Sequence, residues 1–126
     1  MNPLRTALRL SALGLPRGPH IVRYTMYRRL AQVMASRVRP GGRILSISHS
    51  TKLCELLDVD EPEVVEANHP EFNMLALPFG EAEFDYVVSD QVLEHVAGDP
   101  QVAINETWRI LKPGGLAMHT TCFMMP

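Results

Sequence analysis

The segment Phe84-Asp85-Tyr86-Val87-Val88-Ser89-Asp90, followed by Gln91-Val92-Leu93-Glu94-His95-Val96, decides the predicted fold. Its first half is a short apolar run that does not alternate strictly, which is typical of a strand buried on both faces of a parallel sheet. Asp90 ends this strand, and a helical segment follows. Ligands of open α/β sheets bind in the crevice outside the carboxyl ends of the strands. We therefore expect Asp90, Gln91 and His95 to face a bound small molecule.

Length and composition indicate one small domain. The chain has 126 residues, of which 46% are hydrophobic, enough apolar material for a core. It contains no run of about 18 apolar residues, so no membrane-spanning helix is expected. Two cysteines far apart in sequence, Cys54 and Cys122, do not form a disulfide framework. A reducing, cytoplasmic location is therefore the expectation.

Charge is distributed unevenly along the chain. Residues 1–43 hold nine of the 12 basic residues and no acidic ones, although the net charge is −2. A basic lobe could contact nucleic acid or an anionic surface. Packing of basic helices against an acidic body is the simpler interpretation, so nucleic acid is not expected as a partner. Residues 1–19 are interpreted as an N-terminal arm; the alternative, a transit peptide, is disfavoured because Pro16 and Pro19 interrupt an amphipathic helix.

Periodicity and turn residues predict alternating helices and strands over residues 20–126. A helix is expected over His20–Val38, and a serine after the first strand is expected to cap a second helix. A third helix starts at Asp99-Pro100 and is predicted to bury Ile104, Trp108 and Leu111. Every connection suits a mostly parallel sheet. The remaining strands are expected at Arg43–Ser48, Glu63–Glu66, Phe72–Phe79 and Leu116–Phe123.

Glu66 ends the second strand, about twenty residues after the first strand. At this spacing in a nucleotide-binding βαβ unit, an acidic side chain holds a ribose hydroxyl. The strand-turn-helix that precedes it, through Ser48-His49-Ser50-Thr51, would aim free N–H groups at a polar or anionic ligand. The segment predicts a nucleotide-type ligand, with a simple anion left open.

Four motifs in this order resemble the class I S-adenosylmethionine-dependent methyltransferases, close to their type 11 domain, from about Ile44 to the end of the chain. The motifs are Leu77-Pro78-Phe79, Glu83 to Val88, Val92-Leu93-Glu94-His95-Val96 and Arg109-Ile110-Leu111-Lys112-Pro113-Gly114-Gly115. The resemblance implies an α/β, Rossmann-like three-layer sandwich with strand order 3-2-1-4-5. It also implies that S-adenosylmethionine, the methyl donor, lies across strands one, two and four.

The same resemblance implies roles for individual residues. Glu66 would bind the ribose hydroxyls, and Asn73 falls where the family places a polar residue against the adenine amino group. Asp90 and Gln91 would lie beside the methionine end of the donor. His95 is a candidate general base for the acceptor, because an imidazole exchanges protons near neutral pH; simple packing at a helix start is an equal alternative.

The chain departs from the family at two places. Ser46 stands where the first motif has its acidic residue, and Ser48, Ser50 and Lys52 stand where it has glycines that allow close approach to the donor. We therefore expect these donor-binding positions to bind more weakly or in a changed pose. The chain also stops at Pro126, where the family continues with a helix and a hairpin, so a truncated domain is expected.

Methyl transfer to a small-molecule or glycan-type acceptor is therefore the predicted function. The alternatives are a catalytically inactive methyltransferase-like module, favoured by the changed first motif, and an anion or nucleotide binder. No histidine or cysteine pair has the spacing of a zinc motif, so no metal is predicted. The apolar fifth strand, Leu116–Phe123, predicts a homo-oligomer formed through its exposed edge.

Overall fold

The computed structural model describes residues 21–38 and 41–122. It divides into two compact units, with the boundary between Ser36 and Arg37. In the first unit, helix α2 covers Ile21–Ala35, within the helix predicted over His20–Val38, and its Tyr27 and Met34 are buried. The predicted arm at residues 1–19 lies outside the described residues, and no helix among those described is long and apolar enough to cross a membrane.

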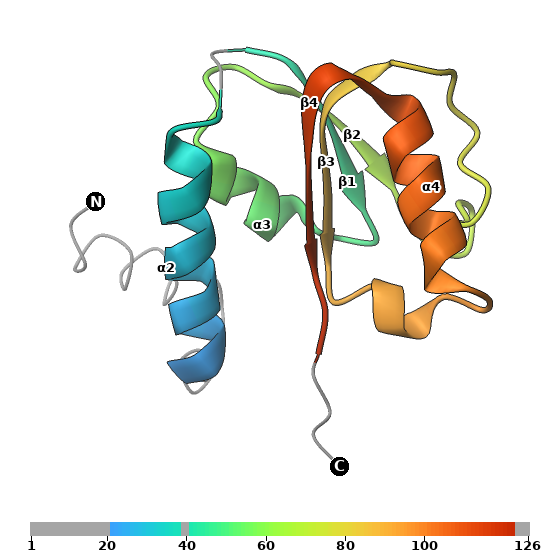
Figure 1. The fold of residues 1–126 in the computed structure, drawn as a ribbon, viewed down its shortest axis with the longest axis horizontal. Helices are drawn as coiled ribbons and strands as arrows, with labels where there is room; N and C mark the ends of the chain where they lie inside the picture. The colour runs from blue at the N-terminus through green and yellow to red at the C-terminus, as the bar shows by residue number, and fades with distance from the viewer. Residues whose placement is uncertain (1–20, 39–40, 123–126) are drawn as a thin grey trace. The chain divides into compact units, whose positions relative to one another are not determined.

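The second unit contains a parallel sheet, as predicted, but with four strands instead of the predicted five (Figure 1). Its strands are β1 (Arg43–Ile47), β2 (Glu63–Ala67), β3 (Phe84–Asp90) and β4 (Leu111–Thr120). Their spatial order is β2-β1-β3-β4, and all three pairings are parallel. The stretch from Phe84 to Asp90 is therefore an interior strand, with Val87 and Val88 fully buried.

The predicted edge strand at Phe72–Phe79 is wrong for the described structure. This segment forms a turn with one isolated antiparallel bridge between Asn73 and Ala76. The Asn73 carboxamide accepts the N–H of Leu75 at 2.9 Å, and the Glu106 side chain accepts the N–H of Leu77 at 2.8 Å. Because turn and side-chain acceptors satisfy the backbone, no ladder forms there. The observed sheet consequently lacks the outer strand of the predicted order 3-2-1-4-5.

Helices α3 (Thr51–Cys54) and α4 (Pro100–Ile110) cover opposite faces of the sheet, which gives the unit three layers (Figure 1). A 3-10 turn, η1 (Glu55–Leu57), continues α3. Asp99 caps α4 by accepting the N–H of Gln101 at 2.9 Å, as predicted from the Asp-Pro pair. The short α3 contacts β1 and β3, and its Leu53 is fully buried.

The buried face of α4 differs from the predicted one. Ala103, Thr107 and Ile110 are buried, whereas Trp108 is 81% exposed. Each residue turns an α-helix by about 100°, so Trp108, one position after Thr107, points away from the sheet. Each residue predicted to be buried on α4 lies one position after a residue that is buried in the structure. The predicted buried face of the helix is therefore one residue out of register.

Arg109 joins α4 to the loop that precedes β3. Its guanidinium donates to the carbonyls of Phe79 at 2.7 Å and Leu77 at 2.9 Å, and to the Glu106 carboxylate at 2.9 Å. Hydrogen bonds from Arg109 hold the pKa of Glu106 below its ordinary value. This clamp, formed by Glu106 and Arg109, fixes the loop that carries Asn73 against α4.

The sheet has an open side at β4, which pairs only with β3 among the strands described. Residues 113–120 carry no Asp, Glu, Lys or Arg, the charges that usually protect such an edge. We propose that two copies of the chain associate by pairing their β4 edges.

Sedimentation velocity measures this association directly. The wild-type chain is expected to form dimers as concentration rises. Ala117→Lys, which places a charge on an exposed residue of β4, should shift the population to monomer. Val102→Lys, at an exposed position on α4, is the matched control and should leave dimers intact. A wild-type chain that stays monomeric at high concentration would refute the proposal.

Candidate active site

Polar residues lie at or beside the carboxyl end of each strand, and the parallel register brings these ends to one edge of the sheet. Glu66 is the register partner of Ser46 on β1, which in turn is level with Val88 on β3. Asp90 ends β3 opposite Thr120 of β4. This carboxyl edge is where an open α/β sheet binds its ligand.

The turn after β1 keeps a backbone conformation that glycine adopts most easily. Ser48 has φ 50° and His49 has φ 61°, both in the left-handed region. The N–H of Ser48 donates to the carbonyl of Ala67 at 2.9 Å, and the N–H of His49 donates to the Asn68 side chain at 2.8 Å. The serine-rich motif therefore folds into a glycine-type turn that is held by Ala67, the last residue of β2, and by Asn68, which follows it.

Glu66 belongs to the same hydrogen-bonded group. Its exposed carboxylate accepts the Asn68 amide at 3.2 Å, and Asn68 in turn accepts the N–H of His49. Asn68 thus links the predicted ribose-binding carboxylate to the turn after β1. Asn68 is not among the predicted site residues; its position directly after a strand is the signal that could have identified it.

Ser46 lies beneath this turn rather than in it. The residue is fully buried, and its hydroxyl has no hydrogen-bond partner of good geometry among the described residues. It is close enough to the Cys54 thiol to lower the pKa of that group slightly, but burial dominates and raises the pKa of Cys54 to about 11. Ser46 therefore offers no exposed atom to a ligand. Lys52 on α3, another changed position of the first motif, is exposed.

The end of β3 is tied to the end of β4. The Thr120 hydroxyl donates to the Asp90 carboxylate and accepts the N–H of Gln91 at 3.1 Å and its side-chain amide at 3.2 Å. Gln91 has φ 58°, a left-handed conformation that these bonds help to maintain. Thr120 is a second residue that the sequence prediction missed, although a polar residue at the end of an apolar strand is a usable signal.

The motif after β3 is also tied to the chain beyond β4. Glu94 lies on a 3-10 turn, η2 (Leu93–His95), and accepts the Thr121 hydroxyl at 3.1 Å and the N–H of Cys122 at 3.4 Å. Burial alone would raise the pKa of Glu94, but a hydrogen bond from its own backbone and those from Thr121 and Cys122 outweigh it, so the pKa lies below the ordinary value. The predicted helical segment is thus only one turn, and it is anchored through Glu94.

Two predicted site residues stand apart from these bonds. His95 follows Glu94, and its side chain is exposed. Asn73 is exposed on the loop that the Arg109 clamp holds, and its carboxamide oxygen already accepts one N–H. An amide oxygen has two lone pairs, so Asn73 can still accept from a ligand. Among residues 21–38 and 41–122, no cluster of three or more His, Cys, Asp or Glu is arranged to hold a metal ion.

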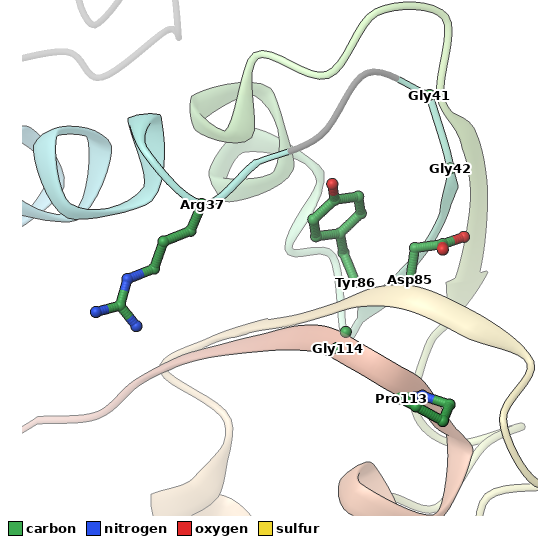
Figure 2. Close-up of a pocket in the computed structure, with 8 residues that line it drawn as sticks. Arg37, Gly41, Gly42, Asp85, Tyr86, Pro113 and Gly114 are labelled. Atoms are coloured by element: carbon green, nitrogen blue, oxygen red, sulfur yellow. The ribbon is translucent and has the colours of Figure 1, made fainter.

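A hollow of about 270 Å³ lies at the opposite, amino edge of the sheet (Figure 2). Figure 2 shows Asp85 and Tyr86 of β3 between Gly42, which precedes β1, and Gly114 of β4. The N–H of Arg43, at 2.9 Å, and the ammonium of Lys112, at 3.1 Å, hold the pKa of Asp85 below its usual range. This carboxylate therefore joins three strands where they begin and is part of the scaffold.

Comparison with known proteins identifies the family. The model of the methyltransferase domain matches residues 27–119, almost three quarters of the chain. The chain belongs to this methyltransferase family. The match includes the β1 turn, Glu66, Asn73, and the Asp90 to His95 segment described above.

Two curated relatives match this methyltransferase domain. One, of Mycolicibacterium smegmatis, is named a probable S-adenosylmethionine-dependent methyltransferase and is 38% identical over 72 residues, 52% of this chain and 28% of the relative. The other is an uncharacterized protein in transposon TN4556 of Streptomyces fradiae, 32% identical over 82 residues, 65% of this chain and 24% of the relative. The chain thus spans about a quarter of the length of each.

Solved structures share the fold at low sequence identity. The [4+2]-cyclase SpnF superposes with a TM-score of 0.53 at 21% identity, over 71% of this chain and 43% of the cyclase. The protein in complex with the Haloferax volcanii Trm112 methyltransferase activator gives a TM-score of 0.54 at 20% identity, over 74% of this chain and 51% of that one. Likeness at this level shows the Rossmann-like fold of the methyltransferase domain.

Proposed function

We propose that the chain binds S-adenosylmethionine and transfers its methyl group to a small-molecule or glycan-type acceptor. The observation that carries the proposal is the exposed Glu66 carboxylate at the carboxyl end of β2. It is joined through Asn68 to the glycine-type turn after β1, in a chain of the methyltransferase family. The name of the Mycolicibacterium smegmatis relative supports the same donor.

The residues at the carboxyl edge fit the nucleoside part of this donor. Glu66 would accept hydrogen bonds from the ribose hydroxyls, and Asn73 would accept one from the adenine amino group. The turn at Ser48 and His49 has the left-handed backbone conformation that glycine adopts most easily. A side chain at Ser48, where the family has a glycine, predicts a weaker fit at the methionine end.

Bound S-adenosylmethionine would supply an electrophilic methyl group on its sulfonium. Asp90 and Gln91, fixed by Thr120, would orient the methionine end for in-line attack by the acceptor. His95, exposed after the same strand, would take the proton from an acceptor hydroxyl or amine. The contribution of the protein is thus mainly positioning, with one proton transfer where the acceptor needs it.

Calorimetric titration with S-adenosylhomocysteine tests this function. The wild-type chain is expected to bind, and Glu66→Ala should weaken binding by roughly 1.5–3 kcal/mol, about ten- to a hundredfold, because charge-assisted bonds to the ribose are lost. Glu63→Ala is the matched control: it removes an exposed carboxylate from the other end of β2, where Glu63 pairs with Arg43 at 3.2 Å. That variant should bind like the wild type.

The rival is a methyltransferase-like module without catalysis. The serines at the glycine positions favour it, and the SpnF cyclase shows that proteins of this fold are not all named for methyl transfer. Absence of S-adenosylhomocysteine binding, or equal binding by wild type and Glu66→Ala, would reject the donor assignment and leave this rival.

A further inference from the structure

The hydroxyl of Ser50 joins the ends of two strands. Ser50 is 1% exposed; its Oγ donates to the carbonyl of Ile47 at the end of β1 and accepts the N–H of Asp90 at 2.8 Å. The carbonyl has no proton and the N–H must donate, so the direction of both bonds is fixed by chemistry. Asp90 is 40 positions away from Ser50 in sequence, so one buried side chain connects the ends of two strands that are distant in the chain.

This role differs from the helix cap expected at this position. Ser50 is the N-cap residue of α3, but its side chain makes no capping hydrogen bond to the helix. Its backbone carbonyl accepts the N–H groups of Leu53 and Cys54, while its hydroxyl reaches back to β1 and across to β3. The side chain therefore stabilises the junction between the strands rather than the helix.

The junction carries the residues expected beside the methyl group. Asp90 is held by Ser50 through its N–H and by Thr120 through its carboxylate. Gln91, in its left-handed conformation, follows directly and is held by the hydroxyl and the carbonyl of Thr120 at the end of β4. Loss of the Ser50 hydroxyl would remove this link between β1 and Asp90 and leave the part-buried N–H of Asp90 and the buried carbonyl of Ile47 without this partner.

We propose that Ser50 is a positioning residue of the donor site, which sets Asp90 and Gln91 relative to the turn at Ser48 and His49. The identity of the ligand in this inference rests on the proposed function. The hydrogen bonds of Ser50 are observed independently of it. Ser48 and Ser50 both stand at glycine positions of the family motif, but their roles differ. Ser48 is strained at φ 50° and would gain from glycine, whereas Ser50, at φ −87°, is unstrained and would lose its bonds.

The experiment compares Ser50→Ala, Ser50→Gly and Ser48→Gly by two measurements. Calorimetry with S-adenosylhomocysteine should show binding weakened roughly tenfold in both Ser50 variants. Binding to Ser48→Gly should be unchanged or tighter. Hydrogen exchange by NMR, without ligand, should show the Asp90 amide exchanging roughly ten times faster in Ser50→Ala, with the amides in the middle of β3 unchanged.

The two measurements separate two kinds of failure. If the wild type does not bind S-adenosylhomocysteine, the proposed function fails, and Asp90 exchange still tests the junction. Unchanged Asp90 exchange in Ser50→Ala, or tighter binding in Ser50→Gly, would overturn the role of Ser50. Should Ser50→Ala not fold, the wild-type chain decides: a slowly exchanging Asp90 amide supports the hydrogen bond, and exchange at the rate of free solvent-exposed amides overturns it.

Discussion

Gly115→Ala is expected to lower the free energy of unfolding by about 2–3 kcal/mol. A Cβ at this position would lie 2.9 Å from the carbonyl oxygen of Lys112 and 3.0 Å from that of Asp85. Both are backbone atoms, the first on β4 itself and the second on β3, so β4 must change its local backbone conformation and also shift away from β3 to accommodate the methyl group. The glycine is needed for the close approach of two strands at the amino edge of the sheet.

Gly114→Ala is the matched control for this substitution. Gly114 has φ 79°, but a Cβ there would meet nothing within 4 Å, so only the left-handed backbone opposes alanine, at a cost of about 1 kcal/mol. Urea unfolding of both variants gives the comparison. Equal losses, or a larger loss for Gly114→Ala, would contradict the close approach of Lys112 and Asp85 to Gly115.

Acidification from pH 7 to pH 4 is expected to cost up to about 3 kcal/mol of stability through His119 alone. His119, on β4, contacts the buried Ser89 hydroxyl through Nδ1 at 2.6 Å, and its Nε2 is buried without a hydrogen-bond partner among the described residues. Burial lowers the pKa of His119 from 6.5 to about 4. An unfolded chain takes up the proton below pH 6.5, while the folded chain resists until about pH 4. The contribution is therefore complete above pH 6.5 and is lost as pH falls to 4.

His119→Gln should remove this pH dependence, because a glutamine amide does not titrate in the range. Urea unfolding at intervals between pH 7 and pH 5 is the measurement, because Asp85, Glu94 and Glu106, whose pKa values are lowered, lose their stabilising contribution at lower pH. His69→Gln, in an exposed loop, controls for loss of a histidine. If the free energy of unfolding falls with pH as steeply in His119→Gln as in the wild type, burial of this ring does not govern the loss of stability in acid.

Patterns within short stretches of sequence were sufficient to predict most of the strands and helices. The apolar run at Phe84–Asp90 is the strand observed, the Asp99-Pro100 pair starts α4 where predicted, and Glu66 lies near the carboxyl end of β2. These features depend on side chains within a few residues of one another. The prediction failed at Phe72–Phe79 and Trp108, where residues distant in sequence decide the structure. Glu106 and Arg109 form hydrogen bonds with the backbone of the loop. Packing on the sheet determines which face of α4 is buried.

The sequence by itself determined the family, the parallel sheet and the polar residues that follow its strands, because these depend on periodicity and on motifs contiguous in the chain. Only the tertiary structure decided how those polar residues are used. Ser50 bonds to Asp90, Thr120 to Asp90 and Gln91, and Asn68 to His49. Each partner is 19 to 40 residues away, and a hydrogen bond over that separation exists only once parallel pairing has brought the strand ends to one edge.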